Sequence, residues 1–143
     1  MKQQSARVYF QAGNYFLKRR EFLSAINSYK DAIRLNQEYF KAYCNLGVAY
    51  KNLGLYKEAE VAFENAIKIK PHSGVAFNNL GNVYTSTGRF NEAKRFYRKA
   101  IAIYPKYQEA YYNLGQVCYF TGEEEKAIEM RVRLLKLRSK SRR

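Results

Sequence analysis

Residues 40–73 read FKAYCNLGVAYKNLGLYKEAEVAFENAIKIKPHS, and most of the remaining chain repeats this pattern. In the first half, Tyr43 and Tyr50 stand seven residues apart with Leu-Gly between them, which places these residues on one stripe of an α-helix. Gly54 interrupts the pattern and Pro71 ends it. Residues 40–73 therefore predict two amphipathic helices joined by a tight turn. The apolar stripe of the second helix consists of Ala59, Phe63, Ala66 and Ile67.

A period of 34 residues accounts for nearly every apolar position of the chain. The turn glycine recurs in the second, third and fourth copies, whereas the first copy has Arg20 there and so predicts a weaker turn. One hairpin is too small to bury its own apolar stripes, so the copies must stack on one another. The sequence predicts an all-α, right-handed solenoid, one domain over residues 1–143. Its four hairpins span residues 6–39, 40–73, 74–107 and 108–141.

The order of recurring residue types within each copy resembles the tetratricopeptide repeat (TPR). The third copy shows it best, with Leu80-Gly81 on the first helix, Gly88 at the turn, Ala93 on the second helix and Pro105 at the end. Tyr or Phe replaces the usual Trp of the family in every copy. The resemblance implies a scaffold that binds proteins rather than an enzyme.

Composition favours an anionic partner. The chain has 26 Lys and Arg against 12 Asp and Glu, a net charge of +14. Residues 131–143 form a basic end without an acidic residue. No apolar stretch is typical of a signal peptide or a membrane span, so we expect a cytoplasmic protein, with Cys44 and Cys118 reduced.

Catalysis, metal binding and a cofactor are not expected. His72 is the only histidine and falls in a predicted loop, and no His-Cys cluster has the spacing of metal ligands. We expect the acidic residues 123–125 to stabilise the start of the last helix through its dipole rather than to form a metal site. We therefore expect no catalytic residue, no metal site and no cofactor.

Binding in a groove lined by the first helices is the remaining route. One residue before each Leu-Gly pair stands Asn45, Asn79 or Asn113, and three residues later on the same helical face follow Asn82 and Gln116, with Asn14 in the first copy. Amide side chains both donate and accept hydrogen bonds, so a column of them can bind the main chain of an extended peptide. This column resembles the asparagine ladder of O-linked N-acetylglucosamine transferase-type superhelices. The alternative interpretation is that these amides only hydrate the groove or bond to helix ends.

A second mode known in the family, a clamp for a C-terminal carboxylate, is not expected. The clamp needs three cations and two asparagines, and only the asparagines are present, so the charge-assisted bonds to a carboxylate are missing. The five clamp positions are occupied by Phe10, Asn14, Asn45, Val75 and Asn79. Basic and aromatic residues elsewhere in the predicted groove favour a partner with acidic and apolar parts. They are Arg7, Lys41, Lys51 and Tyr112.

Two alternative functions stay open. Basic residues of the third copy and of the tail could hold nucleic acid or an anionic membrane surface, with binding that falls steeply as salt rises. The last helix keeps Leu134, Leu135 and Leu137 with nothing after them to cover them, which favours self-association. The sequence does not identify the partner. The anionic-surface candidates are Lys94, Arg95, Arg98, Lys99, Arg138 and Arg142.

Overall fold

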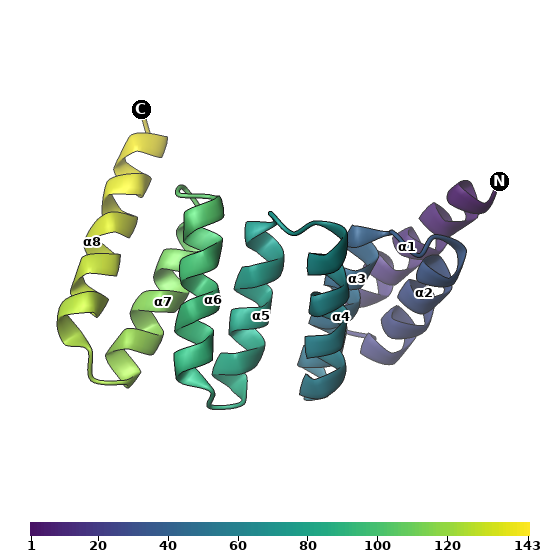
Figure 1. Cartoon of the computed structure of the whole chain (residues 1–143). Coiled ribbons are helices and arrows are strands. Elements are labelled where there is room, and N and C mark those ends of the chain that lie inside the picture. The colour runs from purple at the N-terminus through teal and green to yellow at the C-terminus, as the bar shows by residue number, and fades with distance from the viewer. The chain divides into compact units, whose positions relative to one another are not determined.

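The computed structural model describes all residues 1–143, and it consists of eight helices and no strand. The helices pair into four hairpins, so the predicted all-α fold of four helix-turn-helix repeats is confirmed (Figure 1). The chain divides into two compact units, residues 1–71 and 72–143. The single domain over residues 1–143 stays a prediction. The first unit contains α1 (Lys2–Lys18), α2 (Phe22–Leu35), α3 (Phe40–Asn52) and α4 (Tyr56–Ile69). The second contains α5 (Gly74–Ser86), α6 (Phe90–Ile103), α7 (Gln108–Phe120) and α8 (Glu124–Ser141).

The turns inside the four hairpins share one backbone design. In the second hairpin, the N–H of Leu55 donates to the carbonyl of Tyr50 over 2.9 Å, closing a six-residue loop around Gly54. Gly54 has φ 75°, in the left-handed region that glycine enters without a steric penalty. The first hairpin makes the same turn with Arg20 at φ 62°, a positive φ on a residue that carries a Cβ. The weaker first turn predicted from the sequence therefore has a physical basis.

In the first unit, α3 packs across the hairpin of α1 and α2. The ring of Tyr29 is fully buried and lies against Gly13, where an added Cβ would approach a ring atom to 2.4 Å. Phe63 packs in the same way against Gly47 in the next hairpin. The glycines of the first helices thus make room for a ring on the second helix.

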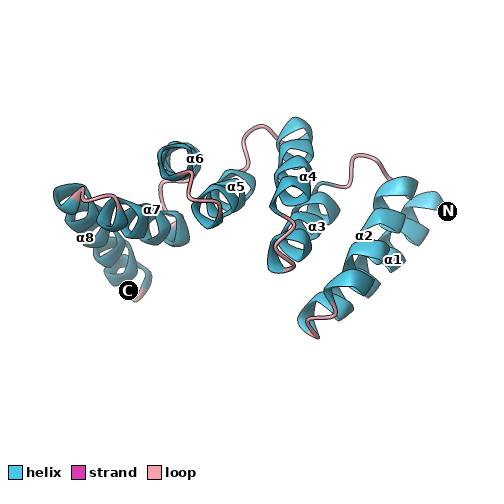
Figure 2. Ribbon diagram, turned by 90° about the horizontal axis from the view of Figure 1, so that it is seen from below, coloured by secondary structure: helices cyan, strands magenta, loops and turns pink.

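The second unit repeats this arrangement, with α7 packed across α5 and α6 (Figure 2). The ring of Tyr97 lies against Gly81, where an added Cβ would come within 2.6 Å of it. The last hairpin differs because Arg131 stands where the other hairpins have a ring. Gly115 therefore faces only Met130 and a backbone carbonyl, at 3.3 Å or more.

Both cysteines are buried and neither forms a disulfide. Burial raises the pKa of Cys44 to about 12, so its thiol stays protonated and unreactive at neutral pH. None of the eight helices combines the length and the apolar character that crossing a bilayer requires.

Candidate functional site

Four of the six amide side chains predicted to line a groove take part in hydrogen-bond networks that involve buried side chains. In the first unit, Asn14 of α1 accepts two bonds at its Oδ1, from the hydroxyl of Tyr29 and from Nδ2 of Asn45, each over 2.8 Å. Burial raises the pKa of Tyr29 to about 12, so the hydroxyl remains a donor at neutral pH. The ring that packs on Gly13 thereby also orients the amide of Asn14.

The second unit contains the same network. Asn82 of α5 accepts at its Oδ1 from the hydroxyl of Tyr97 over 2.7 Å and from Nδ2 of Asn113 over 3.1 Å. Asn113 also donates to Oδ1 of Asn78, which is completely buried and donates in turn to Glu109 over 3.2 Å. Burial likewise raises the pKa of Tyr97 to about 12. The structure therefore brings the predicted Asn82 and Asn113 together through shared bonds.

Each network leaves one whole amide N–H₂ group and one amide oxygen without a hydrogen bond. In the first unit these are the amide N–H₂ of Asn14 and the amide oxygen of Asn45, and in the second those of Asn82 and Asn113. No buried side-chain nitrogen or oxygen lacks a partner, so these unbonded groups are open to solvent. Each unit thus carries, on neighbouring first helices, an unbonded amide N–H₂ and an unbonded amide oxygen.

Asn79 differs from the other two members of the predicted column. Its side chain is half-buried and makes no hydrogen bond within residues 72–143. Asn45 and Asn113 each donate a hydrogen bond from Nδ2 to another side chain of their own unit. The amide of Asn79 makes no such bond in its unit, so its two N–H donors and its oxygen remain unbonded there.

Sequence reasoning missed the coupling between ring and amide, although the sequence carries its signal. The buried tyrosine and the asparagine that it bonds stand 15 residues apart in both networks, Asn14 with Tyr29 and Asn82 with Tyr97. In the second copy the same two positions are Val48 and Phe63. A tyrosine on the second helix thus occurs in the copies that have an asparagine on the first helix, and phenylalanine occurs in the copy that has valine there. The reason is that a buried hydroxyl without a hydrogen-bond partner destabilises the fold. Asn78 was also missed, since the equivalent positions of the other three copies are Phe10, Cys44 and Tyr112.

The remaining groove candidates lie on first helices, three of them in the first unit and Tyr112 in the second. Arg7 of α1 is exposed. Burial raises the pKa of Tyr39, and the positive charge of Arg7 partly opposes that rise. Lys41 is exposed and Lys51 half-buried, both on α3. Tyr112 of α7 accepts a hydrogen bond from Nε2 of Gln116 over 2.9 Å, and both side chains are exposed.

The predicted anionic surface loses one of its members. Lys94 is buried and forms an ion pair with Glu123, so it does not belong to an exposed basic face. Hydrogen bonds from Lys126 and Lys94 lower the pKa of Glu123 to about 2. Two other members are exposed but lie over rings, Arg95 at 5.3 Å from the centroid of Phe96 and Lys99 at 5.2 Å from the same ring. The exposed cations without such a ring contact are Arg98, Arg138 and Arg142.

Titratable groups do not converge in the way that a metal site requires. No group of three or more His, Cys, Asp or Glu side chains could hold a metal ion. His72 is exposed in the segment before α5. That the chain is not an enzyme stays a prediction.

Comparison with solved structures confirms the fold at nearly full length. The crystal structure of MamA matches with a TM-score of 0.88 and 26% sequence identity, covering 95% of this chain and 80% of that chain. The TPR domain of Arabidopsis OM64 matches with a TM-score of 0.81 and 25% identity, covering 84% of this chain and 99% of that chain. The first TPR domain of Spaghetti (RPAP3), bound to the HSP90 peptide SRMEEVD, has a TM-score of 0.79 at 22% identity, covering 84% and 95%.

Sequence comparison identifies the repeat itself. No curated protein sequence matches significantly. Family profiles described as tetratricopeptide repeat match residues 38–106 and 85–141, and one described as TPR repeat matches residues 6–54. Together they span all four hairpins, so the chain belongs to the tetratricopeptide-repeat family.

Proposed function

We propose that this chain is a non-catalytic scaffold that binds an extended peptide segment of a partner protein along its first helices. The family and the structural neighbours support protein binding as the general role. The observation that carries the finer proposal is the unbonded amide donor and acceptor in each unit, held in place by a buried tyrosine. Such groups match the alternating C=O and N–H of an extended main chain and are indifferent to its side chains.

The basic and aromatic residues beside these amides set the expected chemistry of the partner. Arg7, Lys41 and Lys51 favour acidic residues on the peptide, and the exposed Tyr112 favours an apolar one. A clamp for a terminal carboxylate is not part of the proposal, because Phe10 and Val75 occupy two positions that the clamp fills with cations. Among proteins of this fold, the Spaghetti domain is bound to a peptide, which supports peptide binding as a use of the fold.

The test uses Asn79, because its amide has no structural bond within its unit. Peptides selected from a displayed library with the wild-type chain should bind Asn79→Ala about fivefold to tenfold more weakly, the effect of losing one or two hydrogen bonds. The matched control is Asn91→Ala, which removes an exposed amide from α6 instead. Equal affinity of wild type and Asn79→Ala would refute the amide face. Alanine at Asn45 or Asn113 is less informative, because it also breaks an internal bond.

Anionic-surface binding is a second candidate, supported by the net charge of +14 and by exposed arginines on α6 and α8. Binding of duplex nucleic acid or anionic vesicles should then fall steeply between low and physiological salt. Deletion of residues 131–143 would also remove apolar contacts of α8, so Arg138→Ala with Arg142→Ala is the cleaner variant. No loss of binding in that variant counts against this candidate.

A further inference from the structure

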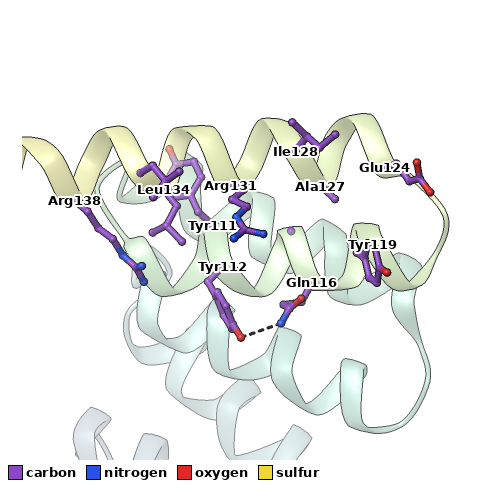
Figure 3. A pocket seen from close by; sticks show the side chains of 12 residues that line it. Tyr111, Tyr112, Gln116, Tyr119, Glu124, Ala127, Ile128, Arg131, Leu134 and Arg138 are labelled. Atoms are coloured by element: carbon purple, nitrogen blue, oxygen red, sulfur yellow. Dashed lines mark hydrogen bonds between the residues drawn. The ribbon is translucent and has the colours of Figure 1, made fainter.

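The last hairpin carries a groove between α7 and α8 that no other part of its unit fills. Its volume is about 600 Å³. Part of its apolar lining is exposed, with Tyr112 at 52%, Ile128 at 63% and Leu135 at 55% of full exposure, whereas Tyr111 and Leu134 at its base are buried. Figure 3 shows Arg131 and Arg138 extending from α8 toward the side on which Tyr112 and Gln116 of α7 lie. A surface of this kind on a folded hairpin marks an interaction site.

The internal repeat shows what shape the groove fits. One period earlier, α7 packs on the surface formed by α5 and α6, which we call the seat. Asn113 of α7 bonds there to Asn78 and Asn82. Adding 34 to these two seat residues gives Tyr112 and Gln116, and both line the groove. The same shift takes Lys94, bonded to the residues that follow α7, to Ile128 in the lining. The groove is therefore the equivalent of a seat that accepts a helix.

The chemistry of the groove differs from that of the occupied seat by its charged residues, which are two arginines and Glu124, the last at the position of Phe90. Tyr97 and Tyr104 of the third hairpin correspond to Arg131 and Arg138, which line the groove and have no ion pair within the chain. The two arginines stand seven residues apart, about 10 Å along α8. In the occupied seat the negative charge of Glu109, on the first turn of α7, contributes to raising the pKa of Tyr97. A helix bound in the same way would place a residue at that position beside Arg131.

We propose that the groove between α7 and α8 binds an acidic amphipathic helix of a partner protein. The apolar stripe of that helix packs on Tyr112, Ile128 and Leu135, and carboxylates in and before its first turn pair with Arg131 and Arg138. Acidic residues at that end are also favoured by the dipole of the bound helix. This site shares Tyr112 with the proposed function but contains none of the amides of Asn45, Asn82 and Asn113, so neither proposal depends on the other.

A second copy of this chain is a poor occupant on charge. Its free first helix, α1, has no Asp or Glu, and the residue equivalent to Glu109 is Arg7. Docking α1 into the groove would bring Arg7 against Arg131, and like charges in an interface cost binding energy. The same position in α3 is Lys41.

The probe is a labelled synthetic peptide of residues 105–122, carrying Tyr107→Glu to face Arg138 and keeping Glu109 to face Arg131. We expect saturable binding to the intact chain, measured by fluorescence anisotropy. Arg131→Glu should weaken it at least about tenfold, and the peptide with Glu109→Arg should regain affinity for that variant. Lys136→Glu, an exposed cation of α8 outside the groove, is the charge-matched control and should change affinity less than about twofold.

Three results would overturn the proposal. One is no binding of the probe by the wild-type chain; another is an equal loss in Arg131→Glu and Lys136→Glu, which would leave only non-specific charge attraction. The third is that a peptide of residues 1–20 binds as well as the acidic probe and that the chain dimerises as its concentration rises. That outcome would make the groove an interface between copies. Circular dichroism of each variant shows that the helices are retained.

Discussion

Replacing Gly81 by Ala should destabilise the second unit, although alanine is the better helix former. The new Cβ would lie 2.6, 2.8 and 3.0 Å from three atoms of the Tyr97 ring, where carbon atoms normally stay about 3.5 Å or more apart. The ring is buried, and its hydroxyl is held by Asn82 over 2.7 Å, so it cannot move aside without losing that bond. Overpacking costs about 1–3 kcal/mol and the lost bond about 1 kcal/mol, against a gain of about 1 kcal/mol in helix propensity. The net loss is about 1–3 kcal/mol.

The matched substitution is Gly115→Ala, at the equivalent position of the next hairpin. Its Cβ would meet only the Cβ of Met130 at 3.3 Å and the carbonyl of Ala127 at 3.6 Å, because no ring covers this glycine. The same chemical change should therefore leave stability within about 1 kcal/mol of wild type. Urea unfolding followed by circular dichroism measures both, and equal shifts in the two variants would refute the account of ring against glycine.

Three further outcomes are expected. Asn14→Val should cost about 1–3 kcal/mol by leaving the hydroxyl of Tyr29 without its acceptor, and adding Tyr29→Phe should recover much of that loss in a double-mutant cycle; strict additivity would contradict the coupling. Arg20→Gly should stabilise the first hairpin by about 0.5–1 kcal/mol, since φ is 62° there, and a lower midpoint in urea would count against backbone strain. The pKa of Glu123 is lowered to about 2, so its contribution is complete above the unfolded value of about 4.3 and is lost as pH falls from about 5 toward 2. Glu123→Gln should therefore flatten the loss of stability between pH 5 and pH 2, and an unchanged profile would exclude this carboxylate as a cause.

The fold was predictable because the residues that end each helix recur at fixed positions of the repeat. Glycine at the turn and proline after the second helix recur at one spacing, and α4 and α6 do end just before Pro71 and Pro105. The exception at Arg20 was also visible in the sequence and proved to be the one non-glycine residue with positive φ.

The candidate site was predictable only in part. The positions of Asn45, Asn79 and Asn113 on the first helices follow from the period, but their unequal hydrogen bonding does not. Lys94 shows the limit most clearly. On the sequence it belongs to a basic run on the outer face, yet its aliphatic stem is buried and its ammonium meets Glu123, a residue 29 positions later.

The sequence by itself determined the four hairpins, the turns and the helix faces, because helical periodicity, glycine and proline act locally and recur in register. Only the tertiary structure decided which side chains remain available to a ligand. Hydrogen bonds between neighbouring hairpins occupy Nδ2 of Asn45 and of Asn113 while leaving their oxygens open, and Arg131 lines an open groove of the last hairpin at the position where the other hairpins bury a ring. Those outcomes depend on distances between residues 15 to 35 positions apart, which no local pattern specifies.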